Sequence, residues 1–260
     1  MINDIVIIGA GNAASNFAVA FRKAGKNILF VFSRNAGKAR KLAEQVNAAY
    51  TDQFRELPRK ADLFLIAVND AAISEVAEHL TGTSGIVAHT SGTVDISVFN
   101  DRFDDYGVFY PLMHLSAENI IGFSEIPLCI EANHPLNLET LIELASAISH
   151  HVHHVPSEKR KILHLSAVFA CNFTNLNYII AEELLKNHDL PFEMLYPLIA
   201  ETAQKIQNTS PSKLQTGPAV REDYEIIAVH KKMLGNFQPY QKIYNLLTET
   251  IIQKKKNNEL

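Results

Sequence analysis

The sequence lacks several features that mark whole classes of protein. It has only two cysteines, Cys129 and Cys171, and both lie in apolar runs, so we expect small buried side chains in a reducing compartment and no disulfide framework. No uninterrupted apolar run approaches the roughly 20 residues that span a membrane. No charged segment followed by an apolar one precedes the first strand-like run, as it would in a signal peptide. We therefore expect a cytoplasmic protein without membrane contacts.

The sequence also has no excess of positive charge. Its formal net charge is −4, so a general attraction to nucleic acid is not expected. The basic run Lys254-Lys255-Lys256 is interpreted as a complement to a helix C-terminus, with a nucleic-acid role as the weaker alternative. Because 260 residues suffice for one large domain or two smaller ones, each can have its own core.

The first half of the sequence alternates short apolar runs with segments of helical periodicity. The runs lie at 5–8, 28–32, 63–68 and 86–89, and the helical segments between them lie at 13–24, 37–47 and 71–80. Further strands are expected at 108–109 and 127–131, with a helix at 134–149. Continuous apolar strands that alternate with helices predict a doubly wound, mostly parallel sheet of the Rossmann type.

The second half of the sequence shows no convincing strand after Ser157. Helices are predicted at 158–186, 191–208, 222–236 and 239–256. The pattern changes near Pro156, so we predict an α/β domain over residues 1–155 and an all-helical domain over residues 156–260.

A glycine-rich turn follows the first predicted strand and opens a helix. Residues 9–14 read Gly-Ala-Gly-Asn-Ala-Ala and fit G-x-G-x-x-A. Gly9 would make the tight turn, Gly11 would let a pyrophosphate approach the backbone, and Ala14 would let the helix pack closely on the strand. The helix N-terminus, with Asn12 and Ala13, would then face the phosphates. The alternative is a tight turn without a ligand.

The end of the second strand bears on the choice of nucleotide. Sites that select NAD usually place Asp or Glu there, to bind the ribose 2′-hydroxyl. This sequence instead has Ser33, Arg34 and Asn35, with Lys38 one turn later. A hydroxyl and a guanidinium can bind a 2′-phosphate, which a carboxylate would repel. The pattern favours NADP(H) over NAD(H), the alternative being a solvated arginine at a strand end.

Two later strand ends would face the same ligand. Ala67-Val68-Asn69 leaves the third apolar run, where backbone can line the nicotinamide side of a cleft. The next residue, Asp70, is interpreted more simply as the N-cap of the following helix. Thr90-Ser91-Gly92 leaves the fourth run, where small hydroxyls and a glycine suit a ligand site. The alternative for that segment is a plain turn.

These motifs together resemble a known group of proteins. The sequence is similar to the β-hydroxyacid dehydrogenase and pyrroline-5-carboxylate reductase group, and more closely to Rossmann-like proteins with a DUF2520 C-terminal domain, which are related to the F420-dependent NADP reductases. Besides the glycine turn and the residues after strand two, the segments that carry this resemblance are His89-Thr90-Ser91-Gly92, Tyr110-Pro111-Leu112, residues 164–172 (HLSAVFACN) and residues 216–223 (TGPAVRED). The resemblance covers nearly the whole chain and implies an NADP oxidoreductase and a homodimer.

One feature of the β-hydroxyacid dehydrogenases is missing. They carry a catalytic lysine one turn before an asparagine on the long helix. Asn172 matches that asparagine, but Val168 and Phe169 stand where the lysine would be. Oxidation of a hydroxy acid by that lysine is therefore not expected. Hydride transfer to or from a C–O or C–N bond still needs a proton donor or acceptor.

His164 and Asn172 are the polar candidates for that role, together with Ser91. Their spacing of eight residues places His164 and Asn172 on a similar face of a mostly apolar helix. The functional interpretation is that they face the nicotinamide across an interdomain cleft. The alternative is a hydrogen-bonded histidine and asparagine in the core.

Three further groups are weaker candidates. Arg221 and Asp223 lie in a loop between helices, where they could bind a substrate carboxylate or pair with each other in a structural or dimer role. His114 follows a predicted strand and is interpreted as a loop histidine. The histidine run at 150–154 invites a metal interpretation, but two histidines on a face rarely make a tight site, so an exposed edge strand and no metal are expected.

The sequence thus predicts an NADP(H)-dependent oxidoreductase that transfers a hydride to or from an unidentified small molecule. A non-catalytic NADP(H)-binding sensor or interaction protein is the alternative, and the missing lysine favours it. An F420-dependent NADP reductase is a third possibility, because a flavin-like acceptor needs less proton transfer from the protein.

Overall fold

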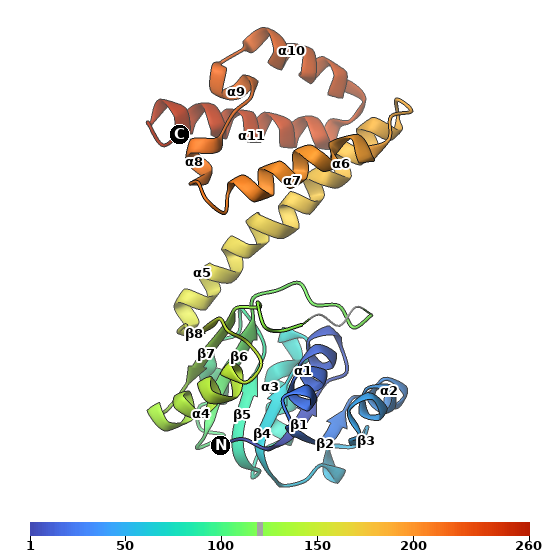
Figure 1. Cartoon of the computed structure of the whole chain (residues 1–260), viewed down its shortest axis with the longest axis vertical. Coiled ribbons are helices and arrows are strands. Elements are labelled where there is room, and N and C mark those ends of the chain that lie inside the picture. The colour runs from blue at the N-terminus through green and yellow to red at the C-terminus, as the bar shows by residue number, and fades with distance from the viewer. Residues whose placement is uncertain (119–121) are drawn as a thin grey trace. The chain divides into compact units, whose positions relative to one another are not determined.

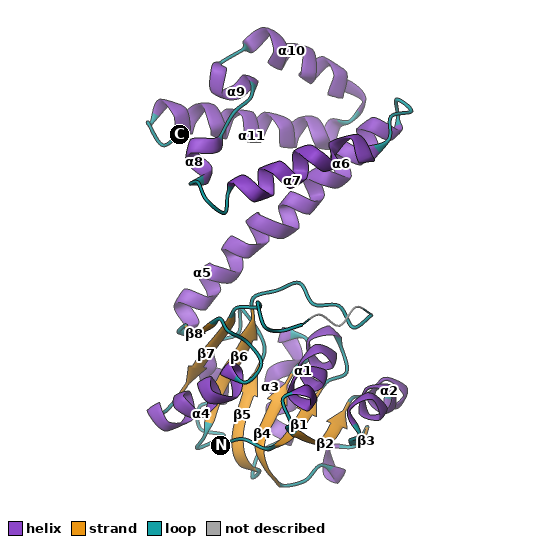
Figure 2. Cartoon of the chain, viewed as in Figure 1, coloured by secondary structure: helices purple, strands orange, loops and turns teal. Residues whose placement is uncertain are grey.

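The computed structural model describes residues 1–118 and 122–260 (Figure 1). The chain divides into two compact units, residues 1–170 and residues 171–260. Strands occur in the first unit alone among the described residues (Figure 2). The last strand ends at His154 and a helix begins at Ser157, where the sequence pattern also changes. The first helix after that change nevertheless belongs to the first unit.

The first unit is built on one eight-stranded sheet. Its strands are β1 (Asp4–Ile8), β2 (Asn27–Phe32), β3 (Ala49–Thr51), β4 (Lys60–Ile66), β5 (Ser84–His89), β6 (Tyr106–Pro111), β7 (Leu128–Ala132) and β8 (Val152–His154). They lie in the order β3-β2-β1-β4-β5-β6-β7-β8, and every pairing is parallel except β6 with β7. The predicted mostly parallel Rossmann-type sheet is confirmed. The edge strand β3 was not predicted, because its three residues, of which only Thr51 is buried, give no apolar run.

Helices cover both faces of this sheet. One apolar cluster joins it to α1 (Asn12–Lys23), α2 (Ala36–Val46) and α4 (Pro135–Ser146), and a second cluster joins it to α3 (Ile73–His79) and the 3-10 turn Ile96–Phe99. Alternate residues of β1 enter the two clusters, since Ile5 and Ile7 lie in the first and Val6 and Ile8 in the second. The sheet is therefore doubly wound, as the continuous apolar runs predicted.

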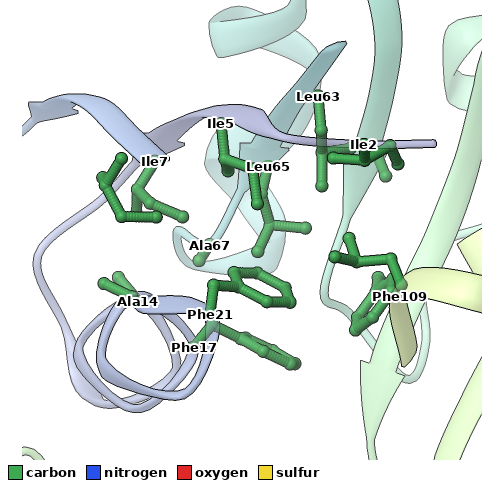
Figure 3. Close-up of a cluster of buried hydrophobic side chains, with 14 of the residues drawn as sticks. Ile2, Ile5, Ile7, Ala14, Phe17, Phe21, Leu63, Leu65, Ala67 and Phe109 are labelled. Atoms are coloured by element: carbon green, nitrogen blue, oxygen red, sulfur yellow. The ribbon is translucent and has the colours of Figure 1, made fainter. Parts of the chain in front are cut away.

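Aromatic rings hold α1 against the first face of the sheet (Figure 3). Phe17 of α1 lies within 5.6 Å, centroid to centroid, of Phe21, Phe109 and Phe123. Ala14 is fully buried beside them, which agrees with its predicted role of letting the helix approach the strand. This packing fixes the N-terminus of α1 at the carboxyl end of β1.

The predicted helix at 158–186 is helical throughout but not uniformly α-helical. It consists of α5 (Ser157–Ala167), a π-helical segment at Val168–Phe173, and α6 (Thr174–Lys186). The predicted long helix is thus present over its whole range, with a different hydrogen-bond register at residues 168–173. A π segment bonds residue i to i+5 and changes the angular spacing, so the 3.6-residue period does not carry through from His164 to Asn172.

The second unit is entirely helical. Besides α6 it contains α7 (Tyr196–Lys205), α8 (Pro211–Leu214), α9 (Pro218–Arg221), α10 (Tyr224–Met233) and α11 (Gln238–Lys256). Predicted helices at 191–208, 222–236 and 239–256 correspond to α7, α10 and α11 with their flanking 3-10 turns. Within the described ranges, no helix is both long enough and apolar enough to cross a membrane.

Candidate functional site

A cleft of about 600 Å³ opens where the sheet changes the direction of its winding. β1 lies between β2 and β4 in the sheet, and ligands of open α/β sheets bind at such a switch point. Predicted cofactor residues from three strand ends line this one cleft: Gly9, Gly11, Asn12, Ala13, Ser33, Arg34, Asn35, Lys38, Ala67, Val68 and Asn69. The structure therefore brings together segments that lie up to sixty residues apart in sequence.

The two glycines of the turn have different physical roles. Gly9 has φ +128°, and a Cβ at this position would lie 2.2 Å from the carbonyl oxygen of Ala67. Only glycine fits there without strain. Gly11 is the N-cap of α1 with an ordinary φ of −93°, and a Cβ built on it meets nothing within 4 Å. Gly11 thus leaves open space at the helix N-terminus, as a bound phosphate requires.

The segment after β2 offers cations and hydroxyls to the cleft. Arg34 and Lys38 are exposed, and Ser33 is half-buried. The side chain of Asn35 caps α2 by accepting a hydrogen bond from the backbone N–H of Lys38 at 3.0 Å. No carboxylate occurs between residues 33 and 38, although Glu75 of α3 also lines the cleft. The charges of this segment suit an anionic group.

Asp70 does not cap a helix, so that prediction is wrong. The N-cap positions of the 3-10 turn Asp70–Ala72 and of α3 fall on Asn69 and Ala72, and neither has a side-chain cap. The Asp70 carboxylate instead accepts a hydrogen bond from the hydroxyl of Thr93. It therefore joins the end of β4 to the loop after β5.

Ser91 stabilises the loop after β5. Its buried Oγ accepts hydrogen bonds from the backbone N–H groups of Thr93 at 3.1 Å and Val94 at 3.0 Å. Thr90 and Gly92 do not line the cleft, and neither does Ser91. Their predicted contacts with a cofactor or substrate stay predictions.

Gly92 lies instead against two polar side chains from other elements. The hydroxyl of Tyr110, on β6, lies 3.1 Å from Nδ1 of His164, on α5. A Cβ on Gly92 would lie 2.7 Å from His164 Nδ1 and 2.8 Å from Tyr110 Cζ. Burial raises the pKa of Tyr110, which keeps its phenol protonated. β6 runs parallel to β5, so Tyr110 lies at the same edge of the sheet as the glycine turn.

His89, at the end of β5, is fully buried and neutral. Burial, assisted by the nearby charge of Arg160, lowers its pKa to about 3. Its Nδ1 accepts a hydrogen bond from the backbone N–H of Ser91 at 3.1 Å, which places the proton on Nε2. His89 therefore shapes the loop and carries no charge at neutral pH.

Sequence reasoning missed a buried ion pair at the start of α5. Arg160 is fully buried and forms a salt bridge with Glu131 of β7. The backbone N–H and the hydroxyl of Ser157 also donate to this carboxylate, at 3.0 and 2.7 Å. The signal was present, because Glu131 interrupts an apolar strand and a buried carboxylate needs a partner. Nothing in the spacing identified that partner as Arg160.

Several other predicted residues lie in the second unit. Asn172 is exposed in the π-helical segment, and its catalytic role stays a prediction. Cys171 is exposed, contrary to the predicted burial, whereas Cys129 is buried as expected and burial raises its pKa to about 11. The prediction for Cys171 failed because an apolar sequence context does not ensure burial. Asp223 caps α10 through the backbone N–H of Ile226 and does not pair with Arg221.

The histidine run lies partly in β8, which is the predicted edge strand. His151 contacts Glu125 at 3.2 Å, and His153 and His154 are exposed. Among residues 1–118 and 122–260, no three histidine, cysteine or acidic side chains are grouped so that they could hold a metal ion. His114 is exposed, in keeping with a loop position.

Two family models match different stretches of the chain. Residues 4–99 match the model described as NADP oxidoreductase coenzyme F420-dependent. Residues 126–251 match the domain of unknown function DUF2520. No protein with a curated description matches the chain.

Among solved structures, a Bacteroides fragilis protein provisionally named an NADP oxidoreductase is 40% identical, with 97% of this chain and 98% of that chain covered and a TM-score of 0.91. An imine reductase from Myxococcus stipitatus in complex with NADP+ is 17% identical, with 98% and 95% covered and a TM-score of 0.70. A pyrroline-5-carboxylate reductase from Coxiella burnetii is 18% identical, with 99% and 98% covered and a TM-score of 0.59. The last two share the fold. Given the 40% identity over nearly the full length, the chain belongs to the family of Rossmann-like proteins that carry a DUF2520 domain.

Proposed function

We propose that the protein is an NADP(H)-dependent oxidoreductase that transfers a hydride to or from a small molecule. The observation that carries this proposal is the composition of the cleft: an open glycine turn at a helix N-terminus and a cationic segment without a carboxylate after β2 share one space. The Bacteroides fragilis relative, provisionally named an NADP oxidoreductase, supports the same conclusion.

The residues of the cleft fit the two charged parts of NADP(H). The free backbone N–H groups at the start of α1 would hold the pyrophosphate, and Gly11 would let it approach. Ser33, Arg34 and Lys38 would hold the 2′-phosphate. When bound, the nicotinamide supplies or accepts the hydride.

In the direction of reduction the proton that accompanies the hydride would come from Tyr110 and His164, and in the direction of oxidation the same pair would accept it. A phenol carries its proton at neutral pH, and the His164 imidazole within hydrogen-bond distance of the Tyr110 hydroxyl can pass a proton to it or take one from it. This assignment does not need the lysine that the β-hydroxyacid dehydrogenases use. It also adds Tyr110 to the catalytic residues predicted from the sequence.

A calorimetric titration with NADPH and NADH tests the cofactor assignment. Charge-assisted hydrogen bonds contribute about 1.5–3 kcal/mol, so Arg34→Ala should weaken NADPH binding about tenfold to hundredfold and leave NADH binding unchanged. Arg40→Ala is the matched control, because Arg40 is an exposed arginine on α2 outside the cleft. Equal losses for both nucleotides in Arg34→Ala would contradict the assignment.

Turnover of NADPH with a panel of carbonyl and imine acceptors, and with oxidised F420, tests the chemistry. Tyr110→Phe should lower kcat by about 10²–10⁴-fold, because general acid catalysis contributes that much. Tyr106→Phe is the control, since Tyr106 lies at the other end of β6 and its hydroxyl donates a hydrogen bond to Oδ1 of Asn100. Tight NADPH binding without turnover of any acceptor would favour the non-catalytic sensor.

We also propose that the protein is a homodimer that associates through the helical unit. Exposed large apolar side chains are concentrated there, including Phe173, Met194, Leu198, Val229 and Met233. Large contiguous apolar patches usually mark interfaces, and we propose that these side chains form one. Sedimentation at two concentrations should give a dimer for the wild type and a monomer for Leu198→Lys. A monomeric wild type at both concentrations would refute the proposal.

A further inference from the structure

A buried guanidinium fastens the first turn of α5 to two other segments. Arg160 forms the salt bridge with Glu131 of β7 and donates to the carbonyl oxygen of Val94 at 2.5 Å and to the hydroxyl of Ser157 at 3.0 Å. The same hydroxyl accepts a hydrogen bond from the backbone N–H of Ile96 at 3.0 Å. β7, the loop after β5 and the start of α5 therefore meet at one cation.

A contribution to the stability of the fold does not by itself explain the buried pair of Arg160 and Glu131. Burying a charged pair costs desolvation energy, and a well-packed apolar pair often stabilises a fold equally well or better. What a guanidinium offers in addition is direction, because its planar donors fix several acceptors at once. The pair is thus better suited to setting a geometry than to holding a helix in place.

The geometry that it sets is that of the proposed proton donor. His164 lies four residues after Arg160, one turn further along the same face of α5. The loop that Arg160 holds through Val94 also carries Gly92, which packs against the His164 ring. Tyr110 lies on β6, which pairs with the strand that carries Glu131. The three elements around the His164–Tyr110 hydrogen bond are all connected to Arg160 or its partner.

We propose that Arg160 is a positioning residue that sets the hydrogen bond between His164 and Tyr110. Its role in catalysis rests on the proposed function, but its effect on this hydrogen bond does not. The hydrogen bond is therefore tested by a spectroscopic measurement and its catalytic consequence by kinetics, so that each can fail alone.

The test compares three variants with the wild type. Arg160→Met/Glu131→Gln removes both charges together, so no unpaired charge stays buried and the fold is kept, while the amide oxygen introduced at position 131 still accepts the Ser157 N–H. Arg160→Lys keeps a positive charge next to Glu131, but a single ammonium group cannot also hold the carbonyl oxygen of Val94 in the same fixed geometry. Lys159→Ala is the matched control, because Lys159 is exposed on the same turn of α5.

The first readout is the ¹⁵N spectrum of the histidine side chains at a fixed pH, with the His164 signals assigned by their loss in His164→Gln. In the double variant the Nδ1 signal should move away from its wild-type position, in Arg160→Lys it should move part of the way, and in Lys159→Ala it should not move. An unmoved Nδ1 signal in the folded double variant would overturn the proposal. If the double variant does not fold, an unmoved signal in the folded Arg160→Lys variant would do the same.

The second readout is steady-state kinetics with an acceptor that the wild type reduces. Misplacement of a catalytic group without loss of cofactor binding should lower kcat about tenfold to hundredfold and leave the KM for NADPH within about twofold. A shifted His164 signal with an unchanged kcat would support the proposal that Arg160 positions His164. It would refute the role of Tyr110 and His164 as the proton donor. A merely structural role would lower the unfolding midpoint and move neither readout.

Discussion

The two glycines of the turn provide a sharp test. Substitution by alanine should lower the free energy of unfolding at Gly9, whereas at Gly11 it should lower the affinity for NADPH. Gly9→Ala places a methyl group at φ +128°, which costs about 1–3 kcal/mol for a residue with a side chain. The methyl also lies 2.2 Å from the Ala67 carbonyl oxygen, whereas ordinary contact begins at 3.4 Å, so the end of β4 must retreat by about 1.2 Å. Such overpacking costs about 1–3 kcal/mol more.

Gly11→Ala should leave stability within about 1 kcal/mol of the wild type. The backbone there is extended, nothing lies within 4 Å of the added Cβ, and the loss of a preferred N-cap residue is offset by reduced freedom of the unfolded chain. The methyl would instead occupy the space proposed for the pyrophosphate. Losing even one charge-assisted hydrogen bond to a phosphate weakens binding about tenfold to hundredfold.

Urea unfolding without cofactor and calorimetric titration with NADPH measure these two effects separately. Gly9→Ala should lose about 2–6 kcal/mol of unfolding free energy, a large part of the stability of an ordinary domain. Gly11→Ala should keep its stability and lose NADPH affinity. Wild-type affinity in Gly11→Ala would refute the location of the pyrophosphate, and wild-type stability in Gly9→Ala would refute the strain argument.

Three further predictions follow from the first unit. Gly92→Ala should separate His164 from Tyr110, since its Cβ would lie under 3 Å from both. Turnover should fall about tenfold or more while the Kd for NADPH is unchanged. A normal kcat would count against a catalytic role of the pair. Burial lowers the pKa of His89 in the folded protein to about 3, below its ordinary value of 6.5. Between these two pH values the unfolded chain therefore binds more protons than the folded one. The free energy of unfolding should then fall as the pH falls, by up to roughly 1.4 kcal/mol per pH unit. Urea unfolding at two pH values within that window should show a smaller loss in His89→Asn. Phe17→Ala should lose about 3–5 kcal/mol in the same assay, because it removes a fully buried ring from an aromatic cluster.

The sequence was sufficient for most strands of the sheet and for the residues that line the cleft. Apolar runs at 5–8 and 28–32 identified β1 and β2 because buried parallel strands leave an unbroken apolar pattern. Parallel strands also end at one edge of their sheet, so the residues after β1, β2 and β4 had to come together once those strands were recognised.

The rest of the site could not be predicted, for physical reasons. The Tyr110–His164 and Glu131–Arg160 contacts join residues 54 and 29 positions apart, and no local pattern specifies such pairs. The π-helical segment escaped because residues 168–173 contain no glycine or proline to break the helix, and a change of hydrogen-bond register leaves no compositional mark. The cytoplasmic location and the domain boundary near residue 155 stay predictions.

The two ends of the sheet bear on how copies of this protein can associate. Both outermost strands, β3 and β8, are only three residues long. A long bare edge offers a row of unpaired peptide groups that can template a strand from another molecule, and short edges prevent this. The two short edge strands therefore disfavour pairing of this sheet with strands of another molecule. The proposed association through helical side chains would then form a closed pair rather than an open-ended aggregate.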